Sequence, residues 1–465
     1  MRRECQVAGF GRVSLQLGIS WSPTESLYTP YIYICGRDNL SGIFTPCSTN
    51  VRLKPPHPAD RVRERRLRLE SSDKQIRGIF TCNVDLPGGG LMRLKPFLLD
   101  LWLDTYEHSI EFNLAASTGP PWTANELLDL GGEESRQRYL NHKVEFSRPA
   151  GADSLREAIA ETQGVSVDHV QVVTGASEAL VVLMWLAAEP GANVIVPLPS
   201  LTNFSALPES LGLELRYYRL RRENSFRTDV DEIKRLADSK TKLILVNSPH
   251  NPTGATIRDS EMEALHEFTY QHGIQLISDE VFHPIYHGRE TKSAARLPHT
   301  TVINDLSKAF PLAGTRTGWI IERDAKRREQ YLTARSYFTA CNSTPGEILA
   351  EIAVRNHFTV LGKTQATASR NLQQLDRFMA AHSEVLGWVR PLGGMTAFPW
   401  LVSGEATRSF CQAAADRGIL FAPGDCFDAP SHFRLGFAAS GDNFGRALDR
   451  LEEFVKSWSA KMVTA

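Results

Sequence analysis

The sequence predicts an α/β protein: a large three-layer domain with a mostly parallel sheet, followed by a smaller α+β domain. Between residues 169 and 305, short apolar runs alternate with segments of helical periodicity. These runs are continuously apolar, which indicates strands buried on both faces of a sheet. After residue 324 the pattern changes to long helices and short strands, as expected for a second, α+β domain.

The elements follow in chain order. A helix is expected at 94–106, and a strand from 113 leads into a loop of Gly and Pro. In the large domain the expected strands are 169–174, 193–196, 213–218, 242–247, 274–278 and 301–305, with 317–321 as a further candidate. The expected helices there are 155–160, 177–188, 203–211, 230–237 and 259–272. Later helices are expected at 327–338, 348–381, 406–417 and 443–458, and later strands at 385–390, 396–401, 419–422 and 433–437. We therefore divide the chain into an arm that contributes to the small domain (92–145), the large domain (146–325) and the small domain (326–465).

Composition excludes several classes of function. The chain of 465 residues is 42% apolar and 23% charged, with a formal net charge of −1. This balance gives no electrostatic reason to expect nucleic acid or an anionic membrane as a partner. The longest apolar run, 179–188, is too short to span a bilayer. Seven cysteines without a Cys-x-x-Cys pattern, and no secretory signal, favour a reducing cytoplasm.

Residues 1–91 form an atypical N-terminal extension. They hold four of the seven cysteines and an arginine-rich cluster at 61–68, and their periodicity is weak. Three interpretations stay open: a disordered basic extension, a small accessory domain, or a mis-annotated start with translation beginning at Met92. Periodic sequence begins directly after Met92, which favours the third.

The stretch from Asp305 to Trp319 carries the first chemical motif. Ser307 and Lys308 follow a buried strand, where burial favours the neutral, nucleophilic amine of a lysine. Such a lysine can form a Schiff base with an aldehyde, and pyridoxal phosphate is the common protein-bound aldehyde. Ser307 and Arg316 are then candidates to hold the phosphate. The simpler alternative is a surface lysine after a strand.

Two further motifs lie at predicted strand ends. Residues 173–180 read as a strand, a tight turn and a helix start, which makes an anion site to which Ser177 can add its hydroxyl or, alternatively, an ordinary helix cap. Residues 247–254 hold two Asn turns pinned by Pro and present a rigid side-chain amide where open α/β sheets bind ligands, the alternative being a plain turn.

Two charged residues interrupt apolar strands. Asp279 ends a buried strand and needs a cation, such as a protonated pyridine nitrogen, unless it only caps the next turn. Arg434 lies within a late apolar strand, and its fork suits a substrate carboxylate, the alternative being an internal salt bridge.

Together these motifs resemble the class I and II aminotransferases, which are fold-type I pyridoxal phosphate enzymes. The resemblance covers about residues 94–458. It implies that Lys308 forms the Schiff base and moves a proton between the substrate α-carbon and the cofactor, and that Asp279 pairs with the pyridine nitrogen. It implies the remaining roles as follows: Asn251 bonds the ring 3-oxygen, Ala176, Ser177, Ser307 and Arg316 hold the phosphate, Arg434 binds the substrate carboxylate, and Gly119 lies in a segment covering the substrate. It also implies a homodimer with active sites at the interface.

Three positions depart from the family pattern. Leu201 stands where an aromatic ring usually stacks on the cofactor, while Phe282 and Phe146 stand where tyrosines are usual. Each change removes one contact, on the order of 1 kcal/mol. Phe204 is a candidate to supply an alternative aromatic face. The anchors remain, so we expect the cofactor to bind while the reaction outcome stays open.

We therefore predict an aminotransferase that moves an amino group between an amino acid and a 2-oxo acid, with no metal. One alternative is another pyridoxal phosphate reaction, such as a lyase, decarboxylase or cyclising synthase. A second is a non-catalytic cofactor-binding or regulatory module. Substrate specificity is not readable, but Trp122, His283 and His287 are candidates for the pocket wall.

Overall fold

The structure, a computed structural model, describes residues 94–464 and, within residues 1–91, five strands. The chain divides into two units, residues 1–91 and 92–465. In the first unit, β1 (Arg2–Val7), β2 (Gly11–Gly18) and β3 (Tyr31–Cys35) pair as an antiparallel sheet, and β4 (Leu67–Arg68) pairs with β5 (Ile79–Phe80). Most of residues 1–91 lie outside the described part, so the three interpretations of this extension stay predictions.

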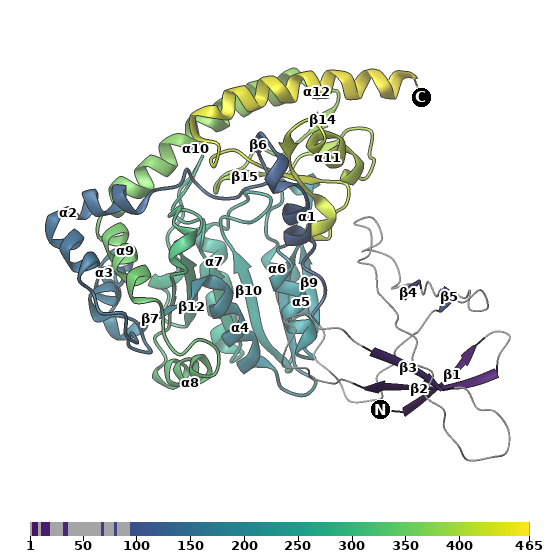
Figure 1. Cartoon of the computed structure of the whole chain (residues 1–465). Coiled ribbons are helices and arrows are strands. Elements are labelled where there is room, and N and C mark those ends of the chain that lie inside the picture. The colour runs from purple at the N-terminus through teal and green to yellow at the C-terminus, as the bar shows by residue number, and fades with distance from the viewer. Residues whose placement is uncertain are drawn as a thin grey trace, which may run out of the picture. The chain divides into compact units, whose positions relative to one another are not determined.

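A seven-stranded sheet forms the centre of the second unit (Figure 1). Its order is β7 (Val170–Val173), β13 (Gly318–Ile321), β12 (Thr300–Asp305), β11 (Gln275–Asp279), β10 (Thr241–Asn247), β8 (Asn193–Leu198) and β9 (Glu214–Arg219). Six of the seven strands run in one direction, and β13 alone runs in the opposite direction. The mostly parallel sheet is as predicted, and the candidate strand at 317–321 is confirmed.

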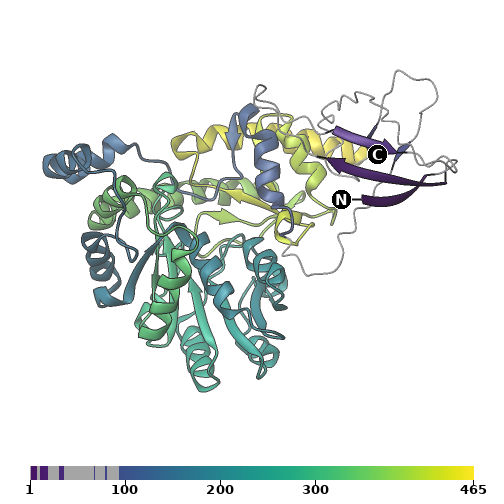
Figure 2. The ribbon, with the colours of Figure 1, turned by 60° about the horizontal axis from the view of Figure 1, so that its bottom comes forward.

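Helices cover both faces of this sheet, as Figures 1 and 2 show. Alternate strand residues enter two separate cores, because successive side chains of a strand point to opposite faces. On β10, for example, Ile244 and Val246 join one core, whereas Leu243 and Leu245 join the other. The first core holds α3 (Asp153–Gln163), α6 (Val230–Leu236) and α7 (Asp259–Gln271), and the second holds α4 (Gly175–Ala187), α5 (Asn203–Ser210) and α8 (Ala325–Ser336). The domain is therefore a three-layer sandwich.

The last part of the chain adds helices and short strands (Figure 1). Its helices are α9 (Thr344–Arg355), α10 (His357–Ala381), α11 (Arg408–Ala415) and α12 (Phe444–Thr464). Its strands are β14 (Leu386–Gly387), β15 (Thr396–Ala397), β16 (Trp400–Leu401), β17 (Ile419–Leu420), β18 (Ala422–Pro423) and β19 (Phe433–Gly436). The early chain joins them, because β6 (Phe112–Asn113), which follows α1 (Leu98–Tyr106), pairs in parallel with β17.

Three predicted elements need correction, and one helix was missed. The helix expected at 348–381 is two helices, because Asn356 adopts a non-helical backbone conformation between α9 and α10, and its side chain caps the Ile352 carbonyl. The strand expected at 396–401 is likewise two short strands, β15 and β16, and the strand expected at 419–422 is divided between β17 and β18, with Phe421 outside both. The helix α2 (Ala124–Leu140) was not predicted; it starts with a capping box in which Thr123 and Glu126 bond each other's backbone N–H.

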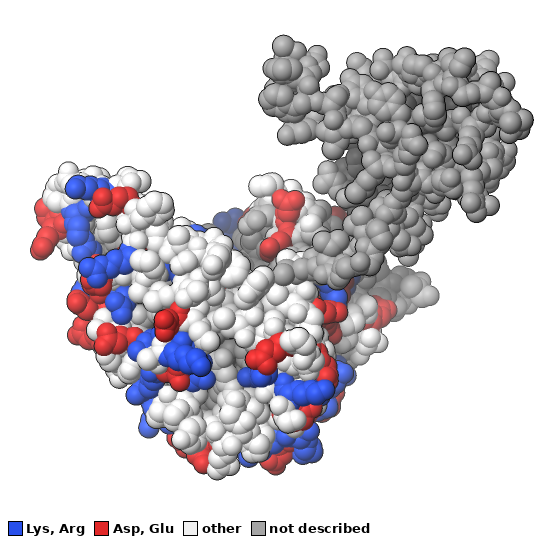
Figure 3. Space-filling view, turned by 90° about the horizontal axis from the view of Figure 1, so that it is seen from below, with Lys and Arg blue, Asp and Glu red and all other residues white. Residues whose placement is uncertain are grey.

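The surface of the second unit carries charges of both signs. On the face of it that Figure 3 presents, Lys and Arg side chains are interspersed with Asp and Glu. Within the described residues, no helix is long and apolar enough to cross a membrane.

Candidate active site

Polar side chains gather where three neighbouring parallel strands end. Asn247, Asp279 and Asp305 are the last residues of β10, β11 and β12, and all three are buried. Asn247 lies directly beside Asp279 in the ladder, and its Nδ2 donates to the Asp279 carbonyl over 3.1 Å. Carboxyl ends of parallel strands meet at one edge of a sheet, where open α/β sheets bind ligands.

Lys308 follows β12 at this edge. Its Nζ donates to the Ser117 hydroxyl over 3.1 Å, and its carbonyl accepts from the Gly119 N–H over 3.4 Å. Burial lowers the pKa of the Lys308 ammonium below its usual value; the nearby guanidinium of Arg434 adds to this, and the Asp305 carboxylate opposes it. This shift moves the amine toward its neutral, nucleophilic form.

Asp279 is a buried carboxylate, with an exposed fraction of only 4%. Its Oδ1 accepts from the Val281 N–H over 3.1 Å, a neutral donor. The pKa of Asp279 is raised to about 7, mainly because the carboxyl group is buried; the Val281 N–H and the charge of Lys308 oppose the rise, and the carboxylates of Asp305 and Glu280 contribute to it. Such a carboxylate becomes favourable when an external cation pairs with it.

Arg434, on β19, enters the same region from the small strands. It is 3% exposed, and both partners described for it are neutral: Nη1 donates to Asn251 Oδ1 over 3.2 Å and Nη2 to the Ala115 carbonyl over 2.6 Å. Its Nε is buried without a partner among the described residues. Burial lowers the pKa of Arg434 to about 10, so the side chain is still charged at neutral pH. This guanidinium has spare N–H groups for an external anion.

The turn between β7 and α4 faces the end of β12. Gly175 has a φ of +75°, and a Cβ on it would stand 2.7 Å from Arg316 Nη2, so glycine allows both the turn and the close approach of Arg316. Arg316 Nη1 donates to the Ser307 hydroxyl over 3.4 Å. Ala176 is buried, whereas Ser177 is exposed on the first turn of α4. These residues make the kind of helix-start site that binds anions.

The positions that depart from the family pattern lie in different surroundings. Phe282 is buried beside Gly394, Leu201 is half-buried, and Phe146 is 89% exposed. Phe204, which belongs to α5, packs in the second core.

The three residues proposed for the pocket wall all have partners within the protein. His283 Nδ1 shares a hydrogen bond of 2.8 Å with the Tyr286 hydroxyl. His287 Nε2 lies 2.7 Å from the Gly394 carbonyl. Trp122 packs under Lys363, whose Nζ is 4.2 Å from the ring centroid.

Two residues of this region were not identified from the sequence. Ser117 contacts Lys308 Nζ, and Asp305 bonds the start of α4. A serine in a Gly/Pro loop and an aspartate at a strand end are both common, so neither carries a sequence signal of its own. Both matter through contacts between residues far apart in the chain.

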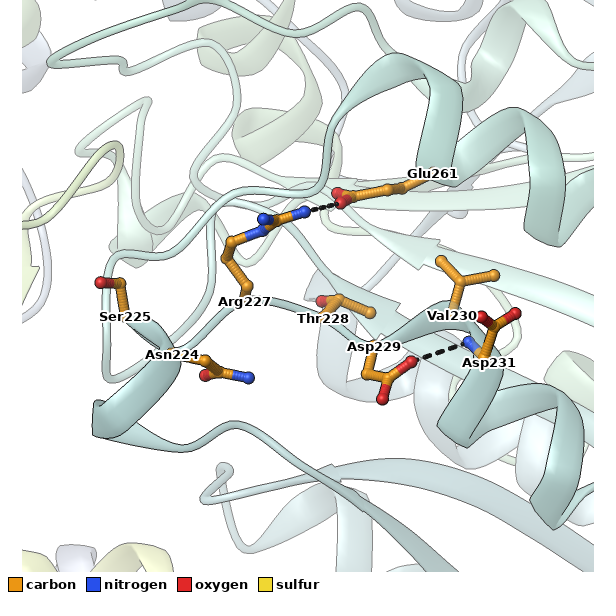
Figure 4. A pocket seen from close by; sticks show the side chains of 8 residues that line it. All are labelled: Asn224, Ser225, Arg227, Thr228, Asp229, Val230, Asp231 and Glu261. Atoms are coloured by element: carbon orange, nitrogen blue, oxygen red, sulfur yellow. Dashed lines mark hydrogen bonds and ion pairs between the residues drawn. The ribbon is translucent and has the colours of Figure 1, made fainter.

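A surface depression of about 520 Å³ lies elsewhere, between the start of α6 and α7 (Figure 4). Its lining residues are Asn224, Ser225, Arg227, Thr228, Asp229, Val230, Asp231 and Glu261. The closest pairs in it bond each other: Arg227 donates to Glu261 over 2.8 Å, and the Asp231 N–H to Asp229 over 2.9 Å. It shares no residue with the strand-end site. The described residues also hold no cluster of three His, Cys, Asp or Glu side chains suited to a metal ion.

Comparisons of sequence and of structure with known proteins point to the same family of enzymes. The sequence profile described as "Aminotransferase class I and II" matches residues 124–451. The capreomycidine synthase of Streptomyces vinaceus is 27% identical over 79% of this chain and 95% of its own length. The aspartate/prephenate aminotransferase of Thermus thermophilus is 29% identical over 68% of this chain and 85% of its own. Among solved structures, the PLP-dependent cyclase OrfR superposes with a TM-score of 0.70 at 28% identity, over 78% of this chain and 98% of the cyclase.

Proposed function

The chain belongs to the class I and II aminotransferases, which use pyridoxal phosphate, and we propose how its own residues divide the work of that reaction. The protein is a pyridoxal phosphate-dependent transaminase of fold type I, and its substrates are an amino acid and a 2-oxo acid. The roles of individual residues, the covalent attachment and the dimer are our proposals.

The donor set fits pyridoxal phosphate. The cofactor has three groups that need a partner: a cationic pyridinium, a phosphate and an aldehyde. For the pyridinium, the site offers the buried carboxylate of Asp279, which has no cationic hydrogen-bond donor. For the phosphate it offers the helix-start anion site with Arg316, and for the aldehyde it offers Lys308, a lysine with a lowered pKa. We propose that Lys308 Nζ forms the Schiff base, that Asp279 holds the ring nitrogen, and that Asn251 bonds the ring 3-oxygen. Ala176, Ser177, Ser307 and Arg316 hold the phosphate.

When bound, pyridoxal phosphate supplies an electron-withdrawing ring that stabilises the charge left when a bond to the substrate α-carbon breaks. The protein directs which bond breaks. Arg434 binds the substrate carboxylate with the N–H groups that Asn251 and Ala115 leave free, which fixes the α-carbon near Lys308. The Lys308 amine would act as the general base that takes the proton from that α-carbon. Asp279, when ionised, would hold the ring nitrogen in its protonated form.

The segment around Gly119 lies over the catalytic lysine. The Gly119 N–H donates to the Lys308 carbonyl, and Ser117 two residues earlier bonds Lys308 Nζ. We propose that this segment covers the substrate and excludes water, so that the Lys308 amine keeps its low pKa during turnover.

The single observation that carries this proposal is the convergence of a half-buried lysine, a buried carboxylate and a buried arginine at one sheet edge, none of them neutralised by an ion pair to another. The test is to incubate the purified enzyme with a panel of amino acids and a 2-oxo acid. We expect a new 2-oxo acid and a new amino acid in equal amounts. Release of ammonia or carbon dioxide, with no amino transfer, would contradict it.

A cyclising reaction on the same cofactor is the second candidate. Phe282 and Leu201 lack groups usual in the family for controlling the cofactor ring, and two of the relatives are a synthase and a PLP-dependent cyclase by name. The product analysis above separates the two candidates, because a cyclised amino acid keeps its nitrogen and needs no 2-oxo acid acceptor.

We further propose a homodimer. Several large apolar side chains are mostly exposed in the single chain, namely Val144, Phe146, Tyr337 and Phe358, each at 84% exposure or more. Exposed apolar side chains of this size are often covered at an interface, and a two-fold dimer buries the same residues from both copies. Sedimentation equilibrium is expected to give twice the chain mass; a monomer at micromolar concentration would contradict the proposal. A cytoplasmic location stays a prediction.

A further inference from the structure

Asp305 is a buried carboxylate close to the proposed Schiff-base lysine. It ends β12, is 6% exposed, and lies three residues before Lys308. A buried carboxylate loses hydration, so it must accept hydrogen bonds from the protein. The two donors described for it are backbone N–H groups from different parts of the chain.

One donor is local and the other is not. The Ser307 N–H donates to Asp305 Oδ1 over 2.8 Å, an ordinary turn between residues two apart. The Ala176 N–H donates to Asp305 Oδ2 over 3.2 Å, although Ala176 is 129 residues earlier in the chain. This second bond ties the end of the sheet to the first turn of α4.

The first turn of α4 is also where the cofactor phosphate is expected to bind. The backbone N–H groups of this turn lie at the positive end of the helix dipole, and the Ala176 N–H is one of these groups. The Asp305 carboxylate already occupies that donor. A Cβ on Gly175 would stand 3.7 Å from Asp305 Oδ2 and 2.7 Å from Arg316 Nη2, so the carboxylate and the arginine approach the same turn.

Close packing keeps Asp305 next to the first turn of α4. Gly318, on β13, pairs with Asp305 in the ladder, and a Cβ at Gly318 would meet Asp305 Cβ at 2.9 Å and the Gly175 carbonyl carbon at 2.9 Å. The absence of a side chain at Gly318 thus lets β12 and the start of α4 approach each other. Arg316 is not hydrogen-bonded to the Asp305 carboxylate, because the bonds described for Arg316 go to the Ser307 hydroxyl and the Ala313 carbonyl.

We propose that Asp305 competes with the cofactor phosphate for the N–H groups at the start of α4, so that the enzyme holds pyridoxal phosphate less tightly than the same site would with a neutral residue. A phosphate in this turn must take the Ala176 N–H from Asp305 and then stand beside a carboxylate of the same sign. The consequence is a cofactor that exchanges with the surrounding solution. This inference rests on the proposed position of the phosphate.

Equilibrium dialysis of the full-length holoenzyme tests the proposal. Wild type, Asp305→Ser and Asp305→Asn are dialysed against a series of pyridoxal phosphate concentrations, and the bound cofactor is measured from its absorbance. Pyridoxal, which lacks the phosphate, is run in parallel. Asp231→Asn is the matched control, because it removes the charge of an exposed carboxylate on α6.

Both Asp305 variants are expected to bind pyridoxal phosphate at least about tenfold more tightly than wild type, and pyridoxal within about twofold of wild type. Equal or weaker binding of pyridoxal phosphate by both variants would overturn the proposal. Equal tightening toward pyridoxal would overturn it too, because the effect would then arise at Lys308 rather than at the phosphate. Loss of fold in both variants, judged by circular dichroism, would show that the carboxylate holds the turn together and does not compete. Failure of every protein, wild type included, to bind the cofactor would instead refute the proposed function.

Discussion

Replacing Arg434 separates substrate binding from chemistry. Its guanidinium has five N–H groups, of which one on each Nη is used by Asn251 Oδ1 and the Ala115 carbonyl. Three remain, so two can grip a carboxylate side by side. Each charge-assisted hydrogen bond contributes about 1.5 kcal/mol or more, so the pair contributes about 3 kcal/mol, equivalent to roughly a hundredfold in binding.

We therefore expect Arg434→Ala to raise the KM for the amino donor about a hundredfold while kcat falls by less than about tenfold, because the carboxylate is bound equally before and during the reaction. Arg434→Lys keeps the charge but loses the fork, and about a tenfold rise in KM is expected. Steady-state rates across donor concentrations give both constants.

Arg235→Ala is the matched control. Arg235 lies exposed on α6 and only approaches Asp229 at 3.7 Å, so its loss removes the same charge without touching the site. An Arg434→Ala enzyme that retains its cofactor and its fold, yet has the KM of wild type, would refute the assignment of the carboxylate to Arg434.

Three further predictions concern Asp279, Ser117 and the exposed apolar surface. Because burial raises the pKa of Asp279 to about 7, this group stabilises the cofactor-free fold fully only below about pH 4, and that contribution is lost as the pH rises through 7. Asp279→Asn should therefore increase the free energy of unfolding of the cofactor-free protein at pH 8 by up to roughly 4 kcal/mol, and raise its Tm accordingly, with no such increase at pH 4. Equal Tm values for wild type and variant at pH 8 would argue against this expectation. Ser117→Ala removes the hydrogen bond to Lys308 Nζ, and we expect kcat to fall about fivefold with little change in KM; stopped-flow spectra of the first half-reaction measure this, and an unaltered rate would exclude a role for the hydroxyl. Phe146→Asp places a charge at an 89% exposed apolar position and should shift the dimer toward monomer in sedimentation velocity, whereas an unchanged dimer would remove Phe146 from the interface.

Much of the site was predictable because its residues interrupt apolar strands. Lys308, Asp279 and Arg434 are charged groups at or in buried strands, and such placement is costly without a chemical use. The structure brings all three to one region. Asn251 was identified from its turn motif, and it contacts Arg434.

Ser117 and Asp305 were not predictable for a different reason. Each acts through a contact between residues more than a hundred positions apart, which no local pattern encodes. The break between α9 and α10 was missed because apolar periodicity continues through Asn356, and only the cap geometry ends the first helix. The helix α2 was missed although the Thr123 and Glu126 capping box signals its start; its Gly131-Gly132 pair weakens the helical pattern, and Gly132 has a φ of +76°.

The covalent attachment at Lys308 is the claim on which the other assignments depend. The direct measurement is to treat the holoenzyme with borohydride, digest it with trypsin and identify the modified peptide by mass spectrometry. We expect to find the mass of a reduced pyridoxal phosphate group on Lys308, and we expect the Lys308→Ala protein to lack the reducible yellow chromophore. A cofactor found on another lysine, or a Lys308→Ala protein that keeps the reducible chromophore, would contradict it.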